Sequence, residues 1–267
     1  MIQALEDRRL MAAQVILDED LYRTLVIIDN GAGNDKVDVT STQLDGIIST
    51  TVVVNNQVQV IDGYLDAVFI DLGAGNDRID LALDGYSLLD TFVDVTLGSG
   101  NDKAKIFSDK EIGTIYGNSG NDKIVIERTP NPVGQRVFGG EGNDTIFGSM
   151  AADVLYGEIG NDLIVGYGGN DIIDPGQGKD LVYAGSGNDL IYYGDNDRLY
   201  GEGGDDLFHA VNPLKETSFN FRNRIDGGPG TDELDYYDFQ DVSRNRLISI
   251  ELTRRVEVIP EDPNELP

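Results

Sequence analysis

Aspartate recurs at a fixed spacing in this chain, each time inside a glycine-rich turn. From Gly139 the sequence divides into nine-residue units such as GGEGNDTIF and GEIGNDLIV, with one unit a residue shorter. Allowing for that gap, the sixth residue is always Asp, namely Asp144, Asp153, Asp162, Asp171, Asp180, Asp189, Asp197 and Asp206. Stacked carboxylates would lie about 5 Å apart, the spacing of paired strands, and would repel one another. The chemistry that this pattern indicates is the binding of cations.

The overall charge points the same way. The chain has 267 residues, with 48 acidic against 20 basic residues, and a formal net charge of −28. Self-repulsion of this size opposes compaction, so nucleic acid and anionic membranes are poor partners and cations are good ones. A hydrophobic content of 40%, with 12 Tyr and 9 Phe, is enough for a core and argues against a disordered chain. An acidic composition adapted to high salt would spread the acids evenly, whereas here Asp recurs at fixed places.

Other features of the composition exclude several kinds of site and segment. The chain has no Cys, so disulfides and thiolate metal sites are impossible. No stretch approaches the roughly 18 apolar residues of a membrane helix. The N-terminal MIQALEDRRLMAAQVILDED has no apolar core, so it is not a conventional signal peptide.

A second regularity shows what positions these aspartates. The eighth residue of each unit is always apolar, namely Ile146, Leu155, Ile164, Ile173, Val182, Ile191, Leu199 and Phe208. The pattern resembles the hemolysin-type nonapeptide of RTX proteins, G-G-x-G-x-D-x-U-x. That resemblance implies an all-β, right-handed parallel β-roll or β-solenoid. In such a roll six residues form a calcium-binding turn and three form a strand, with the eighth residue pointing inward.

Further copies extend the array in both directions. NGAGNDKVD, LGAGNDRID, LGSGNDKAK and GNSGNDKIV contain Asp35, Asp77, Asp102 and Asp122, and the late copy GGPGTDELD contains Asp232. Two units make one coil, so residues 18 apart should stack. This predicts one column of Asp144, Asp162, Asp180 and Asp197 and an opposite column of Asp153, Asp171, Asp189 and Asp206. The wider upstream spacing predicts longer coils with a single column, and a degenerate coil around Asn56 in VVVNNQVQVID.

Calcium suits these residue types. Ca²⁺ takes about six to eight oxygen ligands from carboxylates and backbone carbonyls, and glycine lets a turn bring carbonyls inward without a Cβ clash. The resemblance implies that the aspartates above share several ions with main-chain oxygens of the turns. The residues expected to contribute these oxygens are Gly139, Glu141, Gly157, Ile159, Gly166, Gly168 and Ser186. Ala151 and Ala152, Lys179 beside Asp180, and the separated Asp232 mark turns where binding should be weaker.

The expected organisation has four parts. Residues 1–26 form an N-terminal cap, in which ALEDRRLMAAQVI has helical spacing and LEDRRL resembles a short L-E-x-R-x-L motif of bacterial surface or secreted proteins. Residues 27–138 form a solenoid with longer coils and one calcium column. Residues 139–235 form a compact roll with two columns and an insertion near 210–226, and residues 236–267 supply a last strand or two and a tail.

Catalysis finds little support in the residues. His209 is the one histidine, placed at an outward position, and the H-E-x-x-H and G-x-S-x-G motifs are absent. Carboxylate pairs suited to glycoside chemistry are hard to dismiss in so acidic a chain, yet no pair stands apart from the repeat set.

We therefore expect a non-catalytic, secreted calcium-binding protein with a structural or adhesive role at the bacterial cell surface. The alternative is a carbohydrate-active or accessory module of a secreted enzyme. Outward tyrosines at Tyr156, Tyr183, Tyr192 and Tyr200 leave a glycan- or protein-binding patch open, with cell-surface polysaccharide or another surface protein as its partner. An ice-binding face is disfavoured, because the outward positions are mixed and lack threonine ladders.

Overall fold

The structure is a computed structural model, and it consists of two β-sheets facing each other. It describes residues 14–18, 24–28, 33–44, 47–63, 65–83, 88–108, 113–127, 132–194, 196–210, 223–236, 246–250 and 252–255. Within these residues every regular element is a strand. None of them forms a helix long and apolar enough to span a membrane.

The two sheets take alternate strands of the chain. Sheet A contains, in spatial order, β1 (Gln14–Asp18), β2 (Thr24–Ile28), β6 (Leu65–Asp71), β8 (Leu88–Ser99), β10 (Thr114–Ser119), β12 (Arg136–Glu141), β14 (Val154–Ile159), β16 (Ile172–Asp174), β18 (Leu190–Tyr193), β20 (Leu207–Ala210), β22 (Glu233–Tyr236) and β24 (Leu252–Arg255). Sheet B contains β23 (Arg246–Ile248), β21 (Arg224–Asp226), β19 (Arg198–Gly203), β17 (Leu181–Ser186), β15 (Leu163–Gly168), β13 (Thr145–Phe147), β11 (Lys123–Ile126), β9 (Lys103–Ser108), β7 (Arg78–Leu83), β3 (Lys36–Leu44), β4 (Ile47–Val54) and β5 (Gln57–Asp62).

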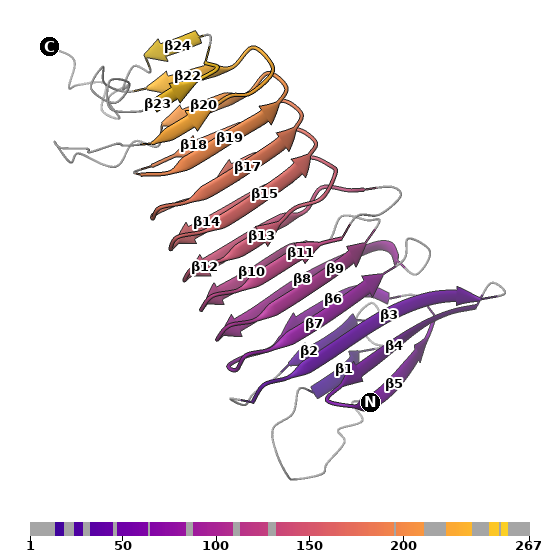
Figure 1. Cartoon of the computed structure of the whole chain (residues 1–267). Helices are drawn as coiled ribbons and strands as arrows, with labels where there is room; N and C mark the ends of the chain where they lie inside the picture. The colour runs from indigo at the N-terminus through magenta and orange to yellow at the C-terminus, as the bar shows by residue number, and fades with distance from the viewer. Residues whose placement is uncertain are drawn as a thin grey trace, which may run out of the picture.

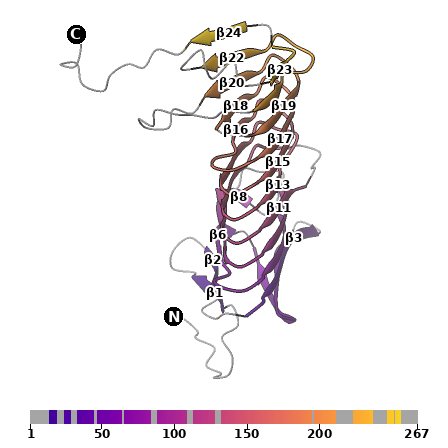
Figure 2. The ribbon, with the colours of Figure 1, turned by 60° about the vertical axis from the view of Figure 1, so that its left-hand side comes forward.

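From β6 to β24 the chain winds as a solenoid. Each strand crosses to the other sheet and pairs in parallel with the strand one coil away. Figures 1 and 2 show these coils stacked along one axis, with β1 and β24 at opposite ends. The predicted all-β parallel roll is therefore confirmed.

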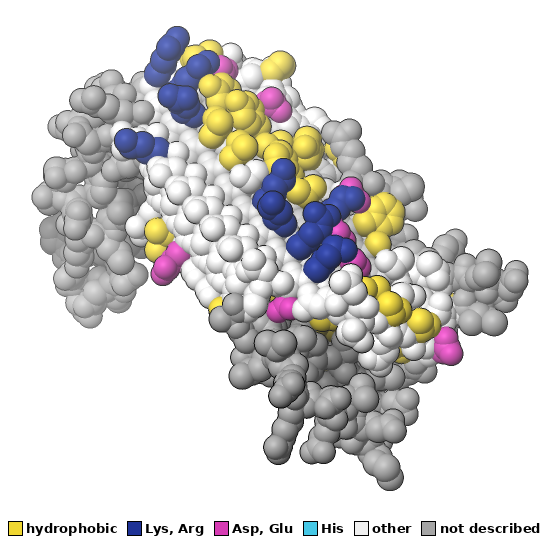
Figure 3. Space-filling model, turned by 60° about the horizontal axis from the view of Figure 1, so that its bottom comes forward, with side chains coloured by type: hydrophobic (Ala, Val, Ile, Leu, Met, Phe, Trp, Pro, Cys, Tyr) yellow, Lys and Arg dark blue, Asp and Glu magenta, His cyan; other side chains and the backbone are white. Residues whose placement is uncertain are grey.

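The core is a line of apolar side chains between the sheets. All eight residues at the eighth repeat position, from Ile146 to Phe208, are fully buried, as the resemblance implied. Because Cβ atoms alternate across a strand, the neighbours of each buried residue face outward. The outer face of sheet B carries Lys, Arg and hydrophobic side chains (Figure 3).

The coils differ in width along the axis. Successive stacked aspartates are separated by 42, 25, 20 and 22 residues from Asp35 to Asp144. Between Asp144 and Asp197 the separations fall to 18, 18 and 17 residues. The wide coils bury more: β7 contributes Ile79, Leu81 and Leu83, whereas β13 contributes Ile146 alone. These spacings agree with the expected wide and compact coils, while the domain boundaries themselves stay a prediction.

Two expectations near the N-terminus are wrong. VVVNNQVQVID forms an antiparallel hairpin of β4 and β5, not a degenerate coil. Asn55 and Asn56 both have positive φ, 48° and 69°, the backbone that a two-residue hairpin turn requires and that Asn tolerates. The predicted helix over residues 4–16 also fails where it can be seen, because Gln14–Asp18 is a strand antiparallel to β2. The rest of that segment, including LEDRRL, lies outside the described residues.

The C-terminal end continues the solenoid past the expected insertion. Residues 211–222 lie outside the described residues, but β21 resumes the parallel stack beside β19. The two tail strands that were expected are β23 and β24, which pair with β21 and β22.

Candidate metal centre

The predicted aspartates stand in two columns, one along each edge where the chain passes between the sheets. In the first column each Asp backbone N–H donates to Oδ1 of the Asp in the next coil. The residues in order are Asp35, Asp77, Asp102, Asp122, Asp144, Asp162, Asp180 and Asp197, with N···O distances of 2.6–3.1 Å. The expected stacking of Asp144 to Asp197 is thus found, and the four upstream aspartates continue the same column.

The second column follows the same rule on the opposite edge. It runs through Asp153, Asp171, Asp189, Asp206 and Asp232, joined by bonds of 2.8–2.9 Å. Asp232, which the sequence set apart from the array, is therefore in register with it. At the N-terminal end of the column Gln135 stands in place of Asp and donates its N–H to Asp153 Oδ1.

The second carboxylate oxygen is what makes these columns a candidate site. Every aspartate of both columns is at least 95% buried. For most of them Oδ2 is buried and accepts no hydrogen bond from the part of the chain that the structure describes. These residues are Asp35, Asp102, Asp122, Asp144, Asp162, Asp171, Asp180, Asp189 and Asp206. A buried carboxylate oxygen without a partner lowers the stability of the fold, and a positively charged ligand bound to each Oδ2 would remove that cost.

The glycines leave open space beside these oxygens. We call a cradle the space beside a glycine Cα that lies between an Asp Oδ2 and a carbonyl oxygen of the next coil. A Cβ placed on Gly139 would lie 2.6 Å from Asp144 Oδ2 and 2.8 Å from the Gly157 carbonyl oxygen. At Gly166 the same test gives 2.2 Å to Asp171 Oδ2 and 2.3 Å to the Ala184 carbonyl oxygen. A bare Cα therefore faces a carboxylate of its own coil and a carbonyl of the next coil.

The predicted main-chain contributors lie around the same cradles. The carbonyl oxygens of Gly139, Gly157 and Gly166 lie beside the carboxylates of Asp122, Asp144 and Asp153 respectively. The carbonyl oxygens of Glu141, Ile159 and Ser186 each accept one N–H from the preceding coil, at 2.6–2.8 Å, and keep a second lone pair. Gly168 lies against Ser186, whose Oγ would be 2.8 Å from an added Cβ.

An all-oxygen, carboxylate-plus-carbonyl environment fits Ca²⁺. Among the described residues no three His, Cys, Asp or Glu side chains gather in one metal-binding group, so backbone carbonyls must complete each ligand set. A Cys- or His-rich zinc site does not fit this chemistry.

The same burial shifts the acidity of the aspartates. Desolvation raises the pKa of Asp171 to about 8 and those of Asp122, Asp162, Asp180 and Asp206 to about 7. The N–H donated to Oδ1 opposes this shift, and neighbouring carboxylates of the column add to it. The pKa of Asp189 rises to about 6 by desolvation, again opposed by a backbone N–H. Burial without a cation therefore favours the protonated form of these six aspartates.

Two turns satisfy their carboxylates within the protein. Asp153 Oδ2 accepts the Ser149 N–H at 2.5 Å, and its Oδ1 also accepts the Ser149 hydroxyl at 3.1 Å. Asp197 Oδ2 accepts the Gly194 N–H at 3.1 Å. The weaker binding expected for the Ala151–Ala152 turn thus has a structural basis in Ser149.

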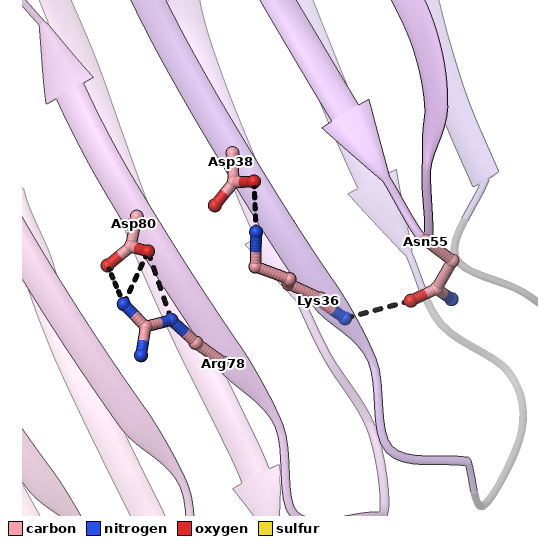
Figure 4. A network of polar contacts seen from close by, with 5 residues as sticks. All are labelled: Lys36, Asp38, Asn55, Arg78 and Asp80. Atoms are coloured by element: carbon pink, nitrogen blue, oxygen red, sulfur yellow. Dashed lines mark hydrogen bonds and ion pairs between the residues drawn. The ribbon is translucent and has the colours of Figure 1, made fainter.

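Asparagine amides lie at both ends of the first column. At its C-terminal end Asn223 takes the place of Asp: its Oδ1 accepts the Asp197 N–H, and its Nδ2 donates to the Gly194 carbonyl at 2.7 Å. At the N-terminal end the Asn55 amide donates to Asp35 Oδ1, and its own Oδ1 accepts the Lys36 N–H at 2.9 Å (Figure 4). Sequence reasoning missed both residues, because neither lies within a recognisable repeat.

The remaining candidates do not form one site. His209 lies at an outward position of β20, as expected, with 27% of its side chain exposed, and its Nδ1 lies 3.1 Å from Asp235 Oδ2. Tyr156 and Tyr192 lie on sheet A, whereas Tyr183 and Tyr200 lie on sheet B and stack at 5.0 Å. The tyrosines therefore belong to two separate faces.

Fold and site together define a calcium-binding parallel β-roll. Comparison with protein families gives the specific type: the model described as RTX calcium-binding nonapeptide repeat matches residues 114–125, 135–164, 147–182, 165–195 and 193–210. The chain therefore carries RTX calcium-binding nonapeptide repeats within residues 114–210. A search of curated proteins found no match. The turns of Asp35, Asp77 and Asp102 lie outside the matched residues, yet they stand in the same column.

Proposed function

We propose that this chain is a secreted bacterial protein that folds when its turns bind calcium and then serves a structural or adhesive role at the cell surface. The observation that carries the proposal is the set of buried, unpartnered Asp Oδ2 atoms in two columns. RTX calcium-binding repeats, which this chain contains, are typical of secreted bacterial proteins.

Folding and metal binding should be one event. The ligands of one cradle come from two coils, so the cradle does not exist in the unfolded chain. The compact coils bury few apolar side chains each, which leaves little to offset the carboxylates of the columns. Bound calcium stabilises the folded state by RT ln(1 + [L]/Kd) for each site.

The proposed extracellular location follows from this coupling of folding to calcium binding. Inside a cell free calcium is low, and the acidic chain would stay unfolded and suited to export. Outside, calcium at higher concentration would fill the cradles and fold it. The role we propose is non-catalytic, and it rests on the match to the repeat itself.

Calcium titration of protein stripped on a chelating resin tests the proposal directly. We expect several ions to bind per chain by isothermal titration calorimetry, and β-sheet circular dichroism to appear over the same calcium range. Magnesium at equal concentration is the control, because it demands a stricter octahedral geometry and gives up its waters reluctantly. Unchanged β-sheet content and melting temperature with and without calcium would contradict the proposal.

One observation favours a second function, the binding of polysaccharide. It is the arrangement of basic residues on the outer face of sheet B.

A further inference from the structure

The outer face of sheet B carries an unbroken line of directly paired residues across ten strands, from β3 to β23. In order these residues are Lys36, Arg78, Lys103, Lys123, Thr145, Leu163, Leu181, Arg198, Arg224 and Arg246. Seven are basic and none is acidic; we call these seven the basic row. The chain as a whole has a net charge of −28, so a line with seven basic and no acidic residues differs from its average composition.

The corresponding outward line on sheet A shows no such sorting. From β6 to β22 it contains Phe69, Asp94, Thr114, Arg136, Val154, Ile172, Leu190, Leu207 and Glu233. One basic residue stands there against two acidic ones. The basic row is therefore a property of one face.

Most of the charge in the basic row is available to a ligand. Lys36 and Arg78 pair with acids of their own strands, Asp38 and Asp80, at 2.6 and 2.7 Å (Figure 4). Arg224 pairs in the same way with Asp226, at 3.5 Å. The other four, Lys103, Lys123, Arg198 and Arg246, are exposed and form no ion pair with any side chain that the structure describes. Lys105, on the neighbouring line, adds a cation that pairs with Glu127.

Between the two basic groups lies an apolar band. It consists of Leu163 and Leu181 in the line itself and of Phe147, Val165 and Tyr183 beside it. Figure 3 shows this arrangement as hydrophobic side chains between two groups of Lys and Arg. The apolar residues of the band are only partly exposed.

We propose that the outer face of sheet B binds an anionic polysaccharide that lies along the solenoid axis, across the strands. Nine strand steps of about 4.8 Å make the line about 43 Å long and one side chain wide. That is the footprint of a single extended polymer with regularly spaced carboxylates or sulfates. The half-buried apolar band would lie against the less polar faces of its sugar rings.

Two other polyanions fit this face less well. A bilayer is bound through apolar side chains that enter it, whereas every residue of the apolar band is already partly buried against the sheet. Single-stranded nucleic acid stacks its bases on exposed aromatic faces, whereas Tyr183 and Tyr200 stack on each other at 5.0 Å. A duplex presents phosphates on two strands, of which one line of cations contacts few.

Calcium would strengthen this binding, and this part of the inference rests on the proposed function. Each of Lys36, Arg78, Lys103, Lys123 and Arg198 directly follows an aspartate of the first column in sequence. Where one cradle of the folded chain lacks calcium, an ionised carboxylate of the column lies next to the basic row and reduces its positive potential. Calcium in the cradles cancels that charge and leaves the basic row to act on the ligand.

The test uses two polymers that differ only in charge. Binding of the calcium-saturated full chain to dextran sulfate and to neutral dextran is measured by biolayer interferometry. We expect binding of dextran sulfate alone, weakening as salt rises because exposed charges are screened. The double variant Lys103→Glu with Arg198→Glu changes one residue in each basic group and should lower the affinity by about tenfold or more.

A matched variant controls for net charge. Arg136→Glu with Arg254→Glu makes the same charge change on sheet A, away from the basic row, and its affinity should stay within about twofold of the unmodified chain. Calcium stoichiometry and circular dichroism check that both variants fold.

Three results would overturn the assignment. They are no binding of dextran sulfate by a chain that does bind calcium, equal losses in the two double variants, and tighter binding of phosphatidylserine vesicles or duplex DNA than of dextran sulfate. If the chain binds no calcium and does not fold, the proposed function fails first, which separates the two ideas.

Discussion

In most aspartates of the columns the two carboxylate oxygens have different roles. Oδ1 accepts the N–H of the neighbouring coil and fixes the register of the stack, while Oδ2, except in Asp153 and Asp197, is left for a cation. The side-chain oxygen of an asparagine can accept this N–H, but its amide group cannot bind a cation. Asn223 accepts the Asp197 N–H in this way at the end of the first column.

Replacing Asp162 with Asn separates acceptance of the N–H from binding of the cation. In Asp162→Asn the side-chain oxygen keeps the bond to the Asp144 N–H, and the new Nδ2 faces the Pro175 carbonyl near Gly157. We expect at least one fewer calcium ion by titration calorimetry. We also expect the variant to keep more β-sheet by circular dichroism without calcium, because removing a buried oxygen without a partner stabilises its folded state by about 1–3 kcal/mol.

The control for this variant is Asp153→Asn. Ser149 already serves both oxygens of Asp153, so calcium stoichiometry should not change there. Equal calcium loss in the two variants would show that the unpartnered Oδ2 atoms do not mark the binding turns.

The glycine cradles make a second prediction at the residue scale. Gly166→Ala would push a methyl group to 2.2 Å from Asp171 Oδ2, so it should weaken calcium binding and cost about 1–3 kcal/mol in calcium-saturated protein. Gly203→Ala is the matched change, because its Cβ would meet nothing closer than 3.9 Å. Thermal unfolding in calcium checks both, and equal losses in the two would count against the cradle.

At the scale of elements, the wide and the compact coils should respond differently to calcium. A strand such as β7 buries three large apolar side chains, each contributing about 1.5–3 kcal/mol, whereas β13 buries one. On chelation we expect β13, β15 and β17 to lose amide protection in hydrogen exchange before β7 and β9. Simultaneous loss along the whole chain would contradict this prediction.

Much of this architecture follows from the repeat spacing together with the resemblance to the RTX nonapeptide. The resemblance implies that the apolar eighth residue is inside, and the nine-residue period then predicts the stacking of Asp162 with Asp144 and Asp180. Features set by tertiary contacts could not be predicted. Asn55 and Asn223 lie 20 and 26 residues from their column partners, Asp35 and Asp197, across a hairpin or an insertion, and no repeat spacing relates them. The basic row could not be predicted from the sequence either, because net charge does not show how the charges divide between the outer faces of the two sheets.

For the molecule as a whole, acidity and calcium should act in opposite directions. The folded-state pKa values of about 6 to 8 lie above the unfolded value near 4. The folded state then binds more protons in this range, so its stability without metal is greatest in acid and falls as pH rises from about 4 to 8.

Circular dichroism of resin-stripped protein at pH 5 and pH 8.5 measures this effect as the fraction of chain that is folded. We expect the metal-free chain to be more stable at pH 5, and calcium to bind more tightly at pH 8.5, because it displaces protons from the carboxylates. A metal-free chain that is more stable at pH 8.5 would show that the columns do not carry the raised pKa values.

The stacking geometry has a mechanical consequence. The strands lie across the solenoid axis and their hydrogen bonds lie along it, with β1 and β24 at opposite ends (Figure 1). Tension between the ends therefore loads the coils in series, and the weakest contact between two coils yields first. Because each cradle joins two coils, the surrounding calcium concentration would set the force at which the molecule begins to lengthen, one coil at a time.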